Sequence, residues 1–190
     1  MNASGLATVL MAPPFLVIVL VTLFIVGVAF YNRHGRETAS TRRHRRYRAT
    51  AGRVLLRLAG LPGDAQRLAY LRKINPYVFE ELLLLTFERQ GLTVVRNDSY
   101  SGDGGIDGQV LIDGEYWLIQ AKRYGRAIAP AHVQHFDQLL KSYHQRGLFI
   151  HTGRTGKMSR DVHAASSRLR IISGQSLLAV LAGQDIRRYL

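Results

Sequence analysis

The chain has 190 residues, a length typical of one globular domain with an additional segment. It contains no cysteine, which excludes a disulfide framework and any thiolate metal site but leaves histidine and carboxylate sites open. Lysine and arginine number 26 against 13 acidic residues, a formal net charge of +13. Such a strong positive charge favours a polyanionic partner, either nucleic acid or anionic lipid.

The N-terminal segment, residues 1–32, contains no charged side chain, and its part from Pro13 to Tyr31 is almost wholly apolar. At about 1.5 Å of rise per residue, a helix over this run comes close to crossing a hydrocarbon core of about 30 Å. A cleaved signal peptide is the alternative, but no positive residue precedes the run and no clear cleavage site follows it. The sequence therefore predicts a single transmembrane anchor over residues 1–32.

The next segment, residues 33–60, concentrates the positive charge, because residues 33–57 hold nine arginines and one acidic residue. Positive charge directly after an apolar span favours an N-terminus outside and a domain in the cytoplasm, here at the inner membrane of the cell. We interpret residues 33–60 as a basic juxtamembrane linker that contacts anionic lipid. A nucleic-acid-binding arm is the alternative interpretation of the same charge.

Residues 61–190 show the pattern of a globular α/β domain. Capping, glycine and periodicity signals predict helices after Pro62-Gly63 and over 75–91, 130–147, 159–168 and 176–183. Apolar and alternating runs predict strands over 92–97, 106–112, 115–123, 148–152 and 169–173. Asp113-Gly114 is a two-residue hairpin signal. This order predicts a mixed sheet, antiparallel and then parallel, with helices on both faces.

The stretch from Gly102 to Gly125 places acids, an amide and a lysine between short apolar runs. Side chains alternate between the two faces of a strand, so Gln120 and Lys122 should project side by side, about 6–7 Å apart. Counting back from the hairpin turn places the partner of Gln120 near Asp107. An acid, an amide oxygen and a lysine are therefore expected to converge at one edge of one sheet face.

These groups suit a hard divalent cation, which prefers oxygen ligands from carboxylates, waters and substrate phosphate. Glu80, on the preceding helix, is expected to reach the metal or its waters, while Lys122 orients a water or stabilises the charge of the transition state. Glycines at 102, 104, 105 and 108 would let the backbone approach a phosphate closely. The alternative is ordinary structure, in which Asp107 belongs to a turn and Lys122 protects a sheet edge.

Three segments in close succession, FEELLLLTFERQGLTVV, GDGGIDG and IQAKRYG, resemble the catalytic domain of Mrr-like restriction endonucleases, within the restriction-endonuclease-like nuclease superfamily. The later LFIHTGRTGKMSRDVHAAS and IISGQSLLAVL are similar to the later strand–helix units of that domain. The resemblance covers roughly residues 74–183. It implies a restriction-endonuclease-like fold and a metal-dependent phosphodiesterase that acts on DNA.

The same resemblance implies roles for four residues. Asp107, Gln120 and the helix residue Glu80 would hold Mg²⁺ or Mn²⁺, and Lys122 would complete the catalytic set. The broader superfamily has an acid where this chain has Gln120, although Mrr-like members commonly carry glutamine there. Because a neutral amide is a weaker ligand than a carboxylate, we expect a low and ion-dependent metal affinity.

Further cations and histidines follow the lysine. The residues that we interpret as contacts to the DNA backbone, with a solvated rim as the alternative, are Arg123, Tyr124, Arg126, Arg154 and Lys157. His132 and His135 have a possible metal spacing on a helix, but no third ligand is near in sequence. We therefore interpret both as solvated helix residues.

Taken together, these patterns predict a membrane-anchored, metal-dependent DNA endonuclease of restriction or DNA-processing type, with the nuclease domain over residues 61–190. Two alternatives stay open. One is a non-catalytic, membrane-tethered DNA-binding protein that keeps the fold. The other is a resolvase-like nuclease for branched DNA, which would act as a homodimer.

Overall fold

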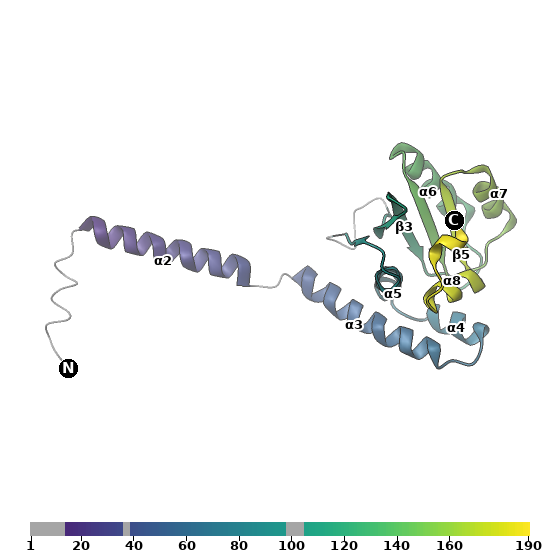
Figure 1. Cartoon of the computed structure of the whole chain (residues 1–190), viewed down its shortest axis with the longest axis horizontal. Helices are drawn as coiled ribbons and strands as arrows, with labels where there is room; N and C mark the ends of the chain where they lie inside the picture. Colours follow the sequence, from purple (N-terminus) through teal and green to yellow (C-terminus); the bar gives the residue numbers. More distant parts are fainter. Residues whose placement is uncertain (1–13, 36–38, 98–104) are drawn as a thin grey trace. The chain divides into compact units, whose positions relative to one another are not determined.

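The computed structural model describes residues 14–35, 39–97 and 105–190 (Figure 1). The chain divides into two compact units, Met1–Arg42 and Arg43–Leu190. The first unit contains helix α2, Pro14–Gly35, and most of its apolar side chains between Leu16 and Val28 are exposed.

The predicted transmembrane anchor over residues 1–32 belongs to this first unit. Its part over residues 1–13 lies outside the described residues. Within the described parts of the chain, none of the helices combines the length and the apolar character that crossing a membrane requires. The structure therefore does not support the predicted anchor.

The second unit is built on a five-stranded mixed sheet with strand order β1-β2-β3-β4-β5. The strands are β1 Val94–Val95, β2 Gly108–Ile112, β3 Glu115–Lys122, β4 Arg146–His151 and β5 Leu169–Ser173. The first three strands pair antiparallel, and β3, β4 and β5 pair parallel. This confirms the predicted change from an antiparallel hairpin to parallel strands joined by crossovers.

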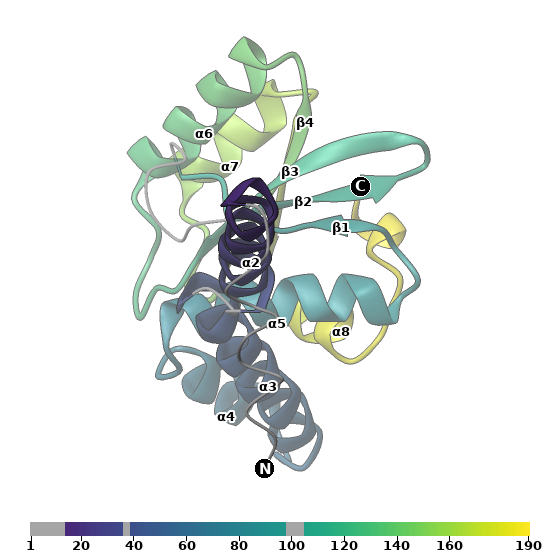
Figure 2. The same ribbon diagram turned by 90° about the vertical axis from the view of Figure 1, so that its left-hand side faces the viewer.

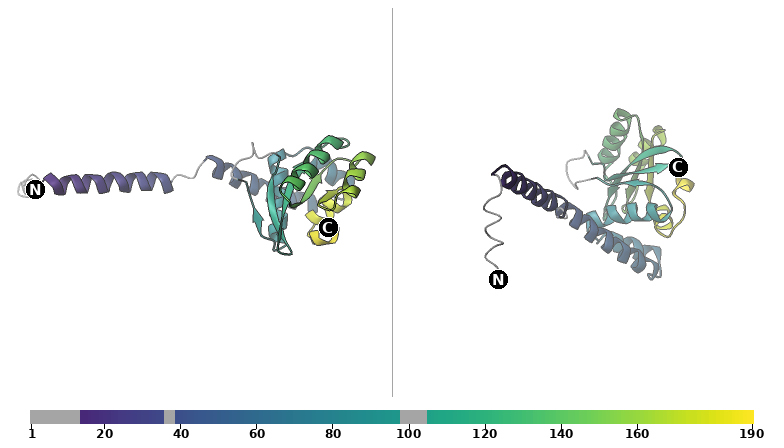
Figure 3. Two further views of the ribbon diagram at one scale, coloured as in Figure 1. Left: turned by 90° about the horizontal axis from the view of Figure 1, so that it is seen from above. Right: turned by 60° about the vertical axis from the view of Figure 1, so that its left-hand side comes forward.

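Helices cover both faces of the sheet (Figure 2). They are α3 Ala39–Ala59, α4 Asp64–Leu71, α5 Pro76–Arg89, α6 Pro130–Ser142, α7 Lys157–Ala165 and α8 Gly174–Leu181, followed by a 3₁₀ turn over Ile186–Tyr189. One hydrophobic cluster joins α5 and α8 to the face with Trp117 and Ile119. A smaller cluster joins α6 to the opposite face through Leu118 and Phe149. Figure 3 shows these layers from two further directions.

The predicted helix starts and turns are confirmed best where a capping residue, a proline or a glycine specifies the backbone conformation. Asn75 caps α5 by accepting a hydrogen bond from the backbone N–H of Tyr77, with Pro76 at the first helical position. Asp113 and Gly114 both have positive φ, at 50° and 85°, as the hairpin turn requires. By contrast, α7 begins at Lys157 after Gly156, two residues before the predicted start at residue 159.

Residues 43–59 differ most from expectation, because the sequence placed them in a linker. They form most of α3, and from Arg43 onward they belong to the compact second unit. Ala51, Val54, Leu55 and Leu58 are buried in the larger hydrophobic cluster, which also includes the apolar face of α5. These four apolar residues recur at helical spacing and form one face, whereas the six arginines of residues 43–59 are all exposed.

Candidate active site

The candidate site lies where β2 begins and β3 ends. The antiparallel register pairs Gly108 with Ile119, so Asp107 and Gln120 are the next residues outward at the same end of the hairpin, as the count from the turn predicted. The Asp107 Oδ2 atom accepts a hydrogen bond of 2.7 Å from the backbone N–H of Ala121. Ala121 lies between Gln120 and Lys122 in the strand, so this bond holds the carboxylate beside both side chains.

Gln120 is 4% exposed, and its amide has only one partner within the described structure. Its Nε2 donates a hydrogen bond of 2.7 Å to the carbonyl oxygen of Gly105. The Oε1 atom is buried without a hydrogen-bond partner among the described residues. Because such an acceptor costs about 1–3 kcal/mol when it has no partner, a cation ligated there would relieve a real penalty.

Gly105 makes this arrangement of Gln120 possible. Its φ is +91°, a conformation that favours glycine, and an added Cβ would overlap the Nε2 atom of Gln120. The sequence predicts that the glycines of this stretch let the backbone approach a phosphate. Among the described residues, Gly105 instead lets the backbone approach the side-chain amide of Gln120. Gly102, Asp103 and Gly104 lie outside the described residues.

Glu80 of α5 faces the same place. Burial first, and the negative charge of Asp107 second, raise the pKa of its carboxyl group to about 8. The positive charge of Lys122 acts in the opposite direction. Glu80, Asp107 and Lys122 are therefore close enough to interact electrostatically, although α5 and the hairpin are separate in sequence.

Lys122 lies at the end of β3 and pairs with His151 of β4 in the parallel register. His151 is fully buried, and burial lowers its pKa to about 4, so the imidazole is neutral at neutral pH. Its Nε2 atom lies 3.1 Å from the hydroxyl of Thr155, which lies 3.1 Å from the hydroxyl of Ser173. The cation at this strand end is thus Lys122 rather than its histidine neighbour.

A pocket of about 440 Å³ opens beside these groups, lined by Gly105, Gln120, Lys122, Arg123, Tyr124, His132 and His135. His132 and His135 are exposed, as expected, yet both line this pocket. The Nδ1 atom of His132 is hydrogen-bonded to the hydroxyl group of Tyr124. The sequence could not place the two histidines here, because only the packing of α6 over the sheet brings them to the end of β3.

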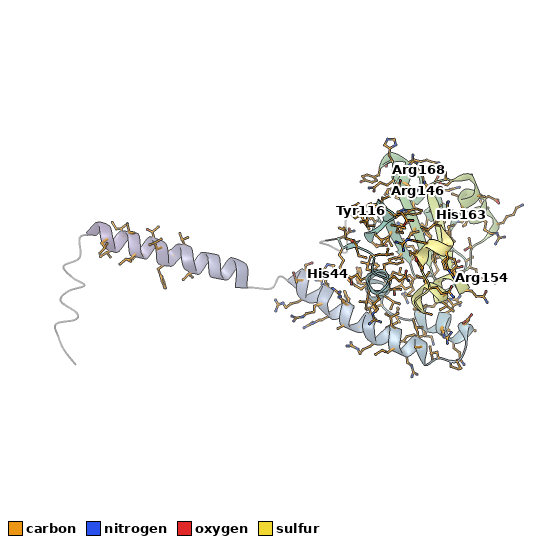
Figure 4. The ribbon with its side chains drawn as sticks, viewed as in Figure 1. His44, Tyr116, Arg146, Arg154, His163 and Arg168 are labelled. Atoms are coloured by element: carbon orange, nitrogen blue, oxygen red, sulfur yellow. The ribbon has the colours of Figure 1, made fainter. Side chains whose placement is uncertain are left out.

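The five residues interpreted as DNA contacts divide into two groups. Arg123 and Tyr124 line the pocket, and Arg123 Nη1 donates a hydrogen bond of 2.7 Å to the carbonyl oxygen of Arg72. Arg126 and Arg154 are exposed on adjacent backbone segments, with Arg154 N donating to Arg126 O at 3.1 Å. Lys157 is exposed at the start of α7. Figure 4 shows Arg154 on the side of the domain away from His44 of α3.

The site offers a cation oxygen donors from side chains of two kinds, carboxylate and amide. Among the described residues, no group of three or more histidine, aspartate or glutamate side chains could hold a metal ion. The set here is two carboxylates and one amide, from Glu80, Asp107 and Gln120. Mg²⁺ is usually bound through one or two carboxylates, with waters and substrate phosphate as its other ligands. The chemistry of the donors therefore fits such an ion.

A family model described as restriction endonuclease, Mrr_cat, matches residues 71–181. The matched segment runs from the last residue of α4 to the end of α8, so it contains all five strands and all four site residues. Neither the curated proteins nor the solved structures compared with the chain include a match. Helix α3 lies outside the matched segment.

Proposed function

The chain belongs to the Mrr_cat restriction endonuclease family, and on this premise we propose that it is a divalent-metal-dependent DNA endonuclease. The family match supports a restriction-endonuclease-like nuclease. One observation carries the metal-dependent part of the proposal, namely the buried Gln120 Oε1 that has no hydrogen-bond partner in the described structure. Gln120 directly precedes Ala121, whose backbone N–H binds the carboxylate of Asp107.

In this proposal, Asp107, Gln120 and Glu80 hold Mg²⁺ or Mn²⁺. When bound, such an ion polarises a phosphate oxygen and lowers the pKa of a water that attacks phosphorus. Asp107 is oriented for this role by the hydrogen bond from the backbone of Ala121. Glu80, with a pKa raised to about 8, holds a proton at neutral pH, and this proton must leave when a cation binds.

Lys122 supplies the fixed positive charge in the proposed mechanism. Its side chain lines the pocket beside Gln120, where a phosphodiester group would enter. An ammonium group in this position stabilises the negative charge that develops on the phosphate during hydrolysis, and it orients the attacking water. The neutral state of the neighbouring His151 leaves this task to the lysine.

Other parts of the proposal rest on the sequence. We propose that Arg123 and Tyr124 contact DNA at the pocket, and that Arg126, Arg154 and Lys157 contact the DNA backbone farther out. A location at the inner membrane, with the nuclease domain in the cytoplasm, rests on the uncharged apolar run from Pro13 to Tyr31 and the arginines after it. A homodimer is proposed only for the resolvase-like alternative.

Cleavage of supercoiled plasmid DNA by the purified full chain tests the main proposal. We expect nicking with Mg²⁺ or Mn²⁺, none with EDTA, and a loss of at least about 100-fold in Asp107→Asn and in Lys122→Ala. Asp113→Asn is the matched control, because Asp113 lies in the turn of the same hairpin, exposed and paired with Arg187. Full cleavage by Asp107→Asn would refute the assignment.

Assays with duplex, branched and methylated DNA distinguish the nuclease from the two alternative functions. Binding of duplex DNA without cleavage, across several metals, would favour the non-catalytic DNA-binding protein. Preferential cleavage of four-way junctions over linear duplex would favour the resolvase-like nuclease. Comparison of methylated with unmethylated plasmid then tests whether cleavage depends on modification of the DNA.

A further inference from the structure

Four arginines of α3 share one flank of the helix. Successive residues of a helix are rotated by about 100°, so Arg43, Arg46, Arg53 and Arg57 fall within about 80° of one another. All four are exposed, and α3 contains no acidic residue. We call these four residues the α3 arginine stripe.

Helix α3 is held in a defined place on the nuclease domain, so the stripe is not a loose charged segment. Its apolar face, including Ala51 and Val54, is buried in the larger hydrophobic cluster. Two polar contacts join α3 to α5, because His44 Nδ1 lies 3.0 Å from Glu81 Oε1 and Arg48 Nη2 lies 2.7 Å from Glu88 Oε2.

A second residue reinforces this attachment. Arg96 follows β1 and contacts both glutamates of α5, with its Nε atom 3.0 Å from Glu81 Oε2 and its Nη1 atom hydrogen-bonded to Glu88. Glu81 is 1% exposed, so its own carboxylate is largely shielded from water, whereas Glu88 is 26% exposed. A cluster of this kind fixes the position of α3 more firmly than surface ion pairs would.

The N-terminal half of α3 packs against α5, the helix that carries Glu80. The ring of Tyr47 in α3 is 5.6 Å from the ring of Tyr77 in α5, centroid to centroid. Tyr77 precedes Glu80 by one helical turn, and Arg43 precedes Tyr47 by one turn. His44 contacts Glu81, the direct neighbour of Glu80. Figure 4 shows His44 near the start of α3, on the side that adjoins the nuclease domain.

We propose that the α3 arginine stripe binds the phosphate backbone of the DNA duplex that enters the candidate site. The inference rests on the proposed function and names a docking surface for its substrate. Arg43 and Arg57 are separated by about 21 Å along the helix axis, comparable with about six base pairs of duplex. Arginine suits this role because its planar guanidinium group binds phosphate through paired hydrogen bonds.

The position of α3 favours DNA over an anionic membrane as the partner of the stripe. A lipid-binding segment needs only to carry charge, whereas this helix is packed against the element that holds Glu80. The stripe also lies outside the segment that matches the nuclease family. It therefore adds a sequence-independent binding surface to a catalytic domain whose own pocket holds few cations.

The test measures DNA binding by the full chain in EDTA, so that cleavage plays no part. A fluorescein-labelled duplex of about 30 base pairs is titrated at several salt concentrations, and anisotropy gives the Kd. The variant Arg46→Gln/Arg53→Gln/Arg57→Gln is compared with Arg89→Gln/Arg146→Gln/Arg188→Gln. Both triple variants lose the same charge from exposed positions, and Arg89, Arg146 and Arg188 lie outside α3.

We expect the stripe variant to bind at least about 10-fold more weakly than the control variant at about 0.1 M salt. The slope of log K against log salt should also fall by about 2 to 3, close to 0.9 for each lost phosphate contact. Equal affinities and slopes in the two triple variants would overturn the inference. If the stripe triple variant melts early, the single variants replace it, each with an expected slope change of about 1.

Two further measurements, cleavage by the wild-type chain and binding to vesicles, distinguish DNA binding by the stripe from the nuclease proposal and from membrane binding. Weaker binding by the stripe variant, together with a wild-type chain that never cleaves DNA, would support the stripe and refute the nuclease proposal. Unchanged binding with normal wild-type cleavage would refute the stripe alone. Vesicles of phosphatidylcholine with phosphatidylserine test the membrane, and a stripe variant that loses vesicle binding but keeps DNA affinity would overturn the inference.

Discussion

Helix α5 carries two adjacent glutamates that face different parts of the molecule. Glu81 points into a buried cluster, where His44 and Arg96 both contact its carboxylate. Glu80 faces Asp107 as well as Lys122, and burial raises its pKa to about 8. Neighbouring carboxylates thus take different tasks. Glu81 is paired with Arg96 and His44 and fastens α3 to α5, and Glu80 is placed beside a second acid.

The two environments also differ in how well the charge is compensated. Around Glu81, His44 from α3 and Arg96 after β1 both contact the carboxylate. Around Glu80, one lysine opposes the combined effect of burial and a second carboxylate. An acid kept protonated in this way is typical of a functional site, where a cation can take the place of the proton.

The strongest test of this difference is Glu80→Gln. We expect cleavage to fall by about 100-fold or more, because the neutral amide weakens cation binding beside Asp107. Folding should not suffer, since the substitution replaces a carboxyl that is already protonated at neutral pH. Plasmid cleavage and thermal melting of the same preparation measure both effects. A variant that melts early but cleaves normally would show that Glu80 is structural.

The reciprocal change, Glu81→Gln, should act on stability. Removing the negative charge leaves His44 and Arg96 with a weaker partner in a largely buried place. Breaking such a pair typically costs about 3 kcal/mol in free energy of unfolding. Urea denaturation measures this loss, and cleavage per folded molecule at low temperature should stay within about threefold of wild type. Loss of cleavage without loss of stability would reverse the assignment of the two glutamates.

Periodicity and turn chemistry predict the part of the site that lies within one hairpin. Asp113-Gly114 sets the register, and strand alternation then brings Asp107, Gln120 and Lys122 together. The same signals predict the change from antiparallel to parallel pairing. These features follow from contacts that are close in sequence, or from one strongly specified turn.

Contacts between distant segments were not predictable in this way. Arginines dominate the composition of α3, so its four buried apolar residues were hidden within an apparently polar linker. His132 and His135 line the pocket only because α6 packs over the sheet. The different environments of Glu80 and Glu81 likewise depend on which elements face each side of α5, and a pair of adjacent glutamates carries no such information.

The pH dependence of metal binding provides a finer test of the Glu80 environment. Below pH 8 the carboxyl is protonated, so Mg²⁺ affinity should rise by up to about tenfold for each pH unit between 6 and 8. Without metal, stability changes with pH in the opposite direction, because ionised Glu80 then has no metal ion beside it. The folded-state pKa exceeds the ordinary value of 4.5, so the contribution of Glu80 to stability is fully present below pH 4.5 and is lost as pH rises through 8.

Thermal shift with and without Mg²⁺ across this range measures both effects. Glu80→Gln should flatten both profiles, while Glu81→Gln should leave their slopes in place at a lower Tm. An affinity for Mg²⁺ that does not change between pH 6 and 8 would contradict the proposed role of Glu80 as a ligand that must first lose a proton.

The smallest expected effect concerns the backbone that supports the amide ligand. Gly105→Ala places a Cβ where Gln120 Nε2 lies, at a backbone φ of +91°, so the amide must shift. We expect a loss of about 1–2 kcal/mol in stability and a several-fold weaker Mg²⁺ affinity. Gly125→Ala is the matched control, because nothing lies within 4 Å of the added Cβ there. If Gly105→Ala weakens stability but leaves Mg²⁺ affinity unchanged, then Gln120 is not a ligand and the site depends on Glu80 and Asp107 alone.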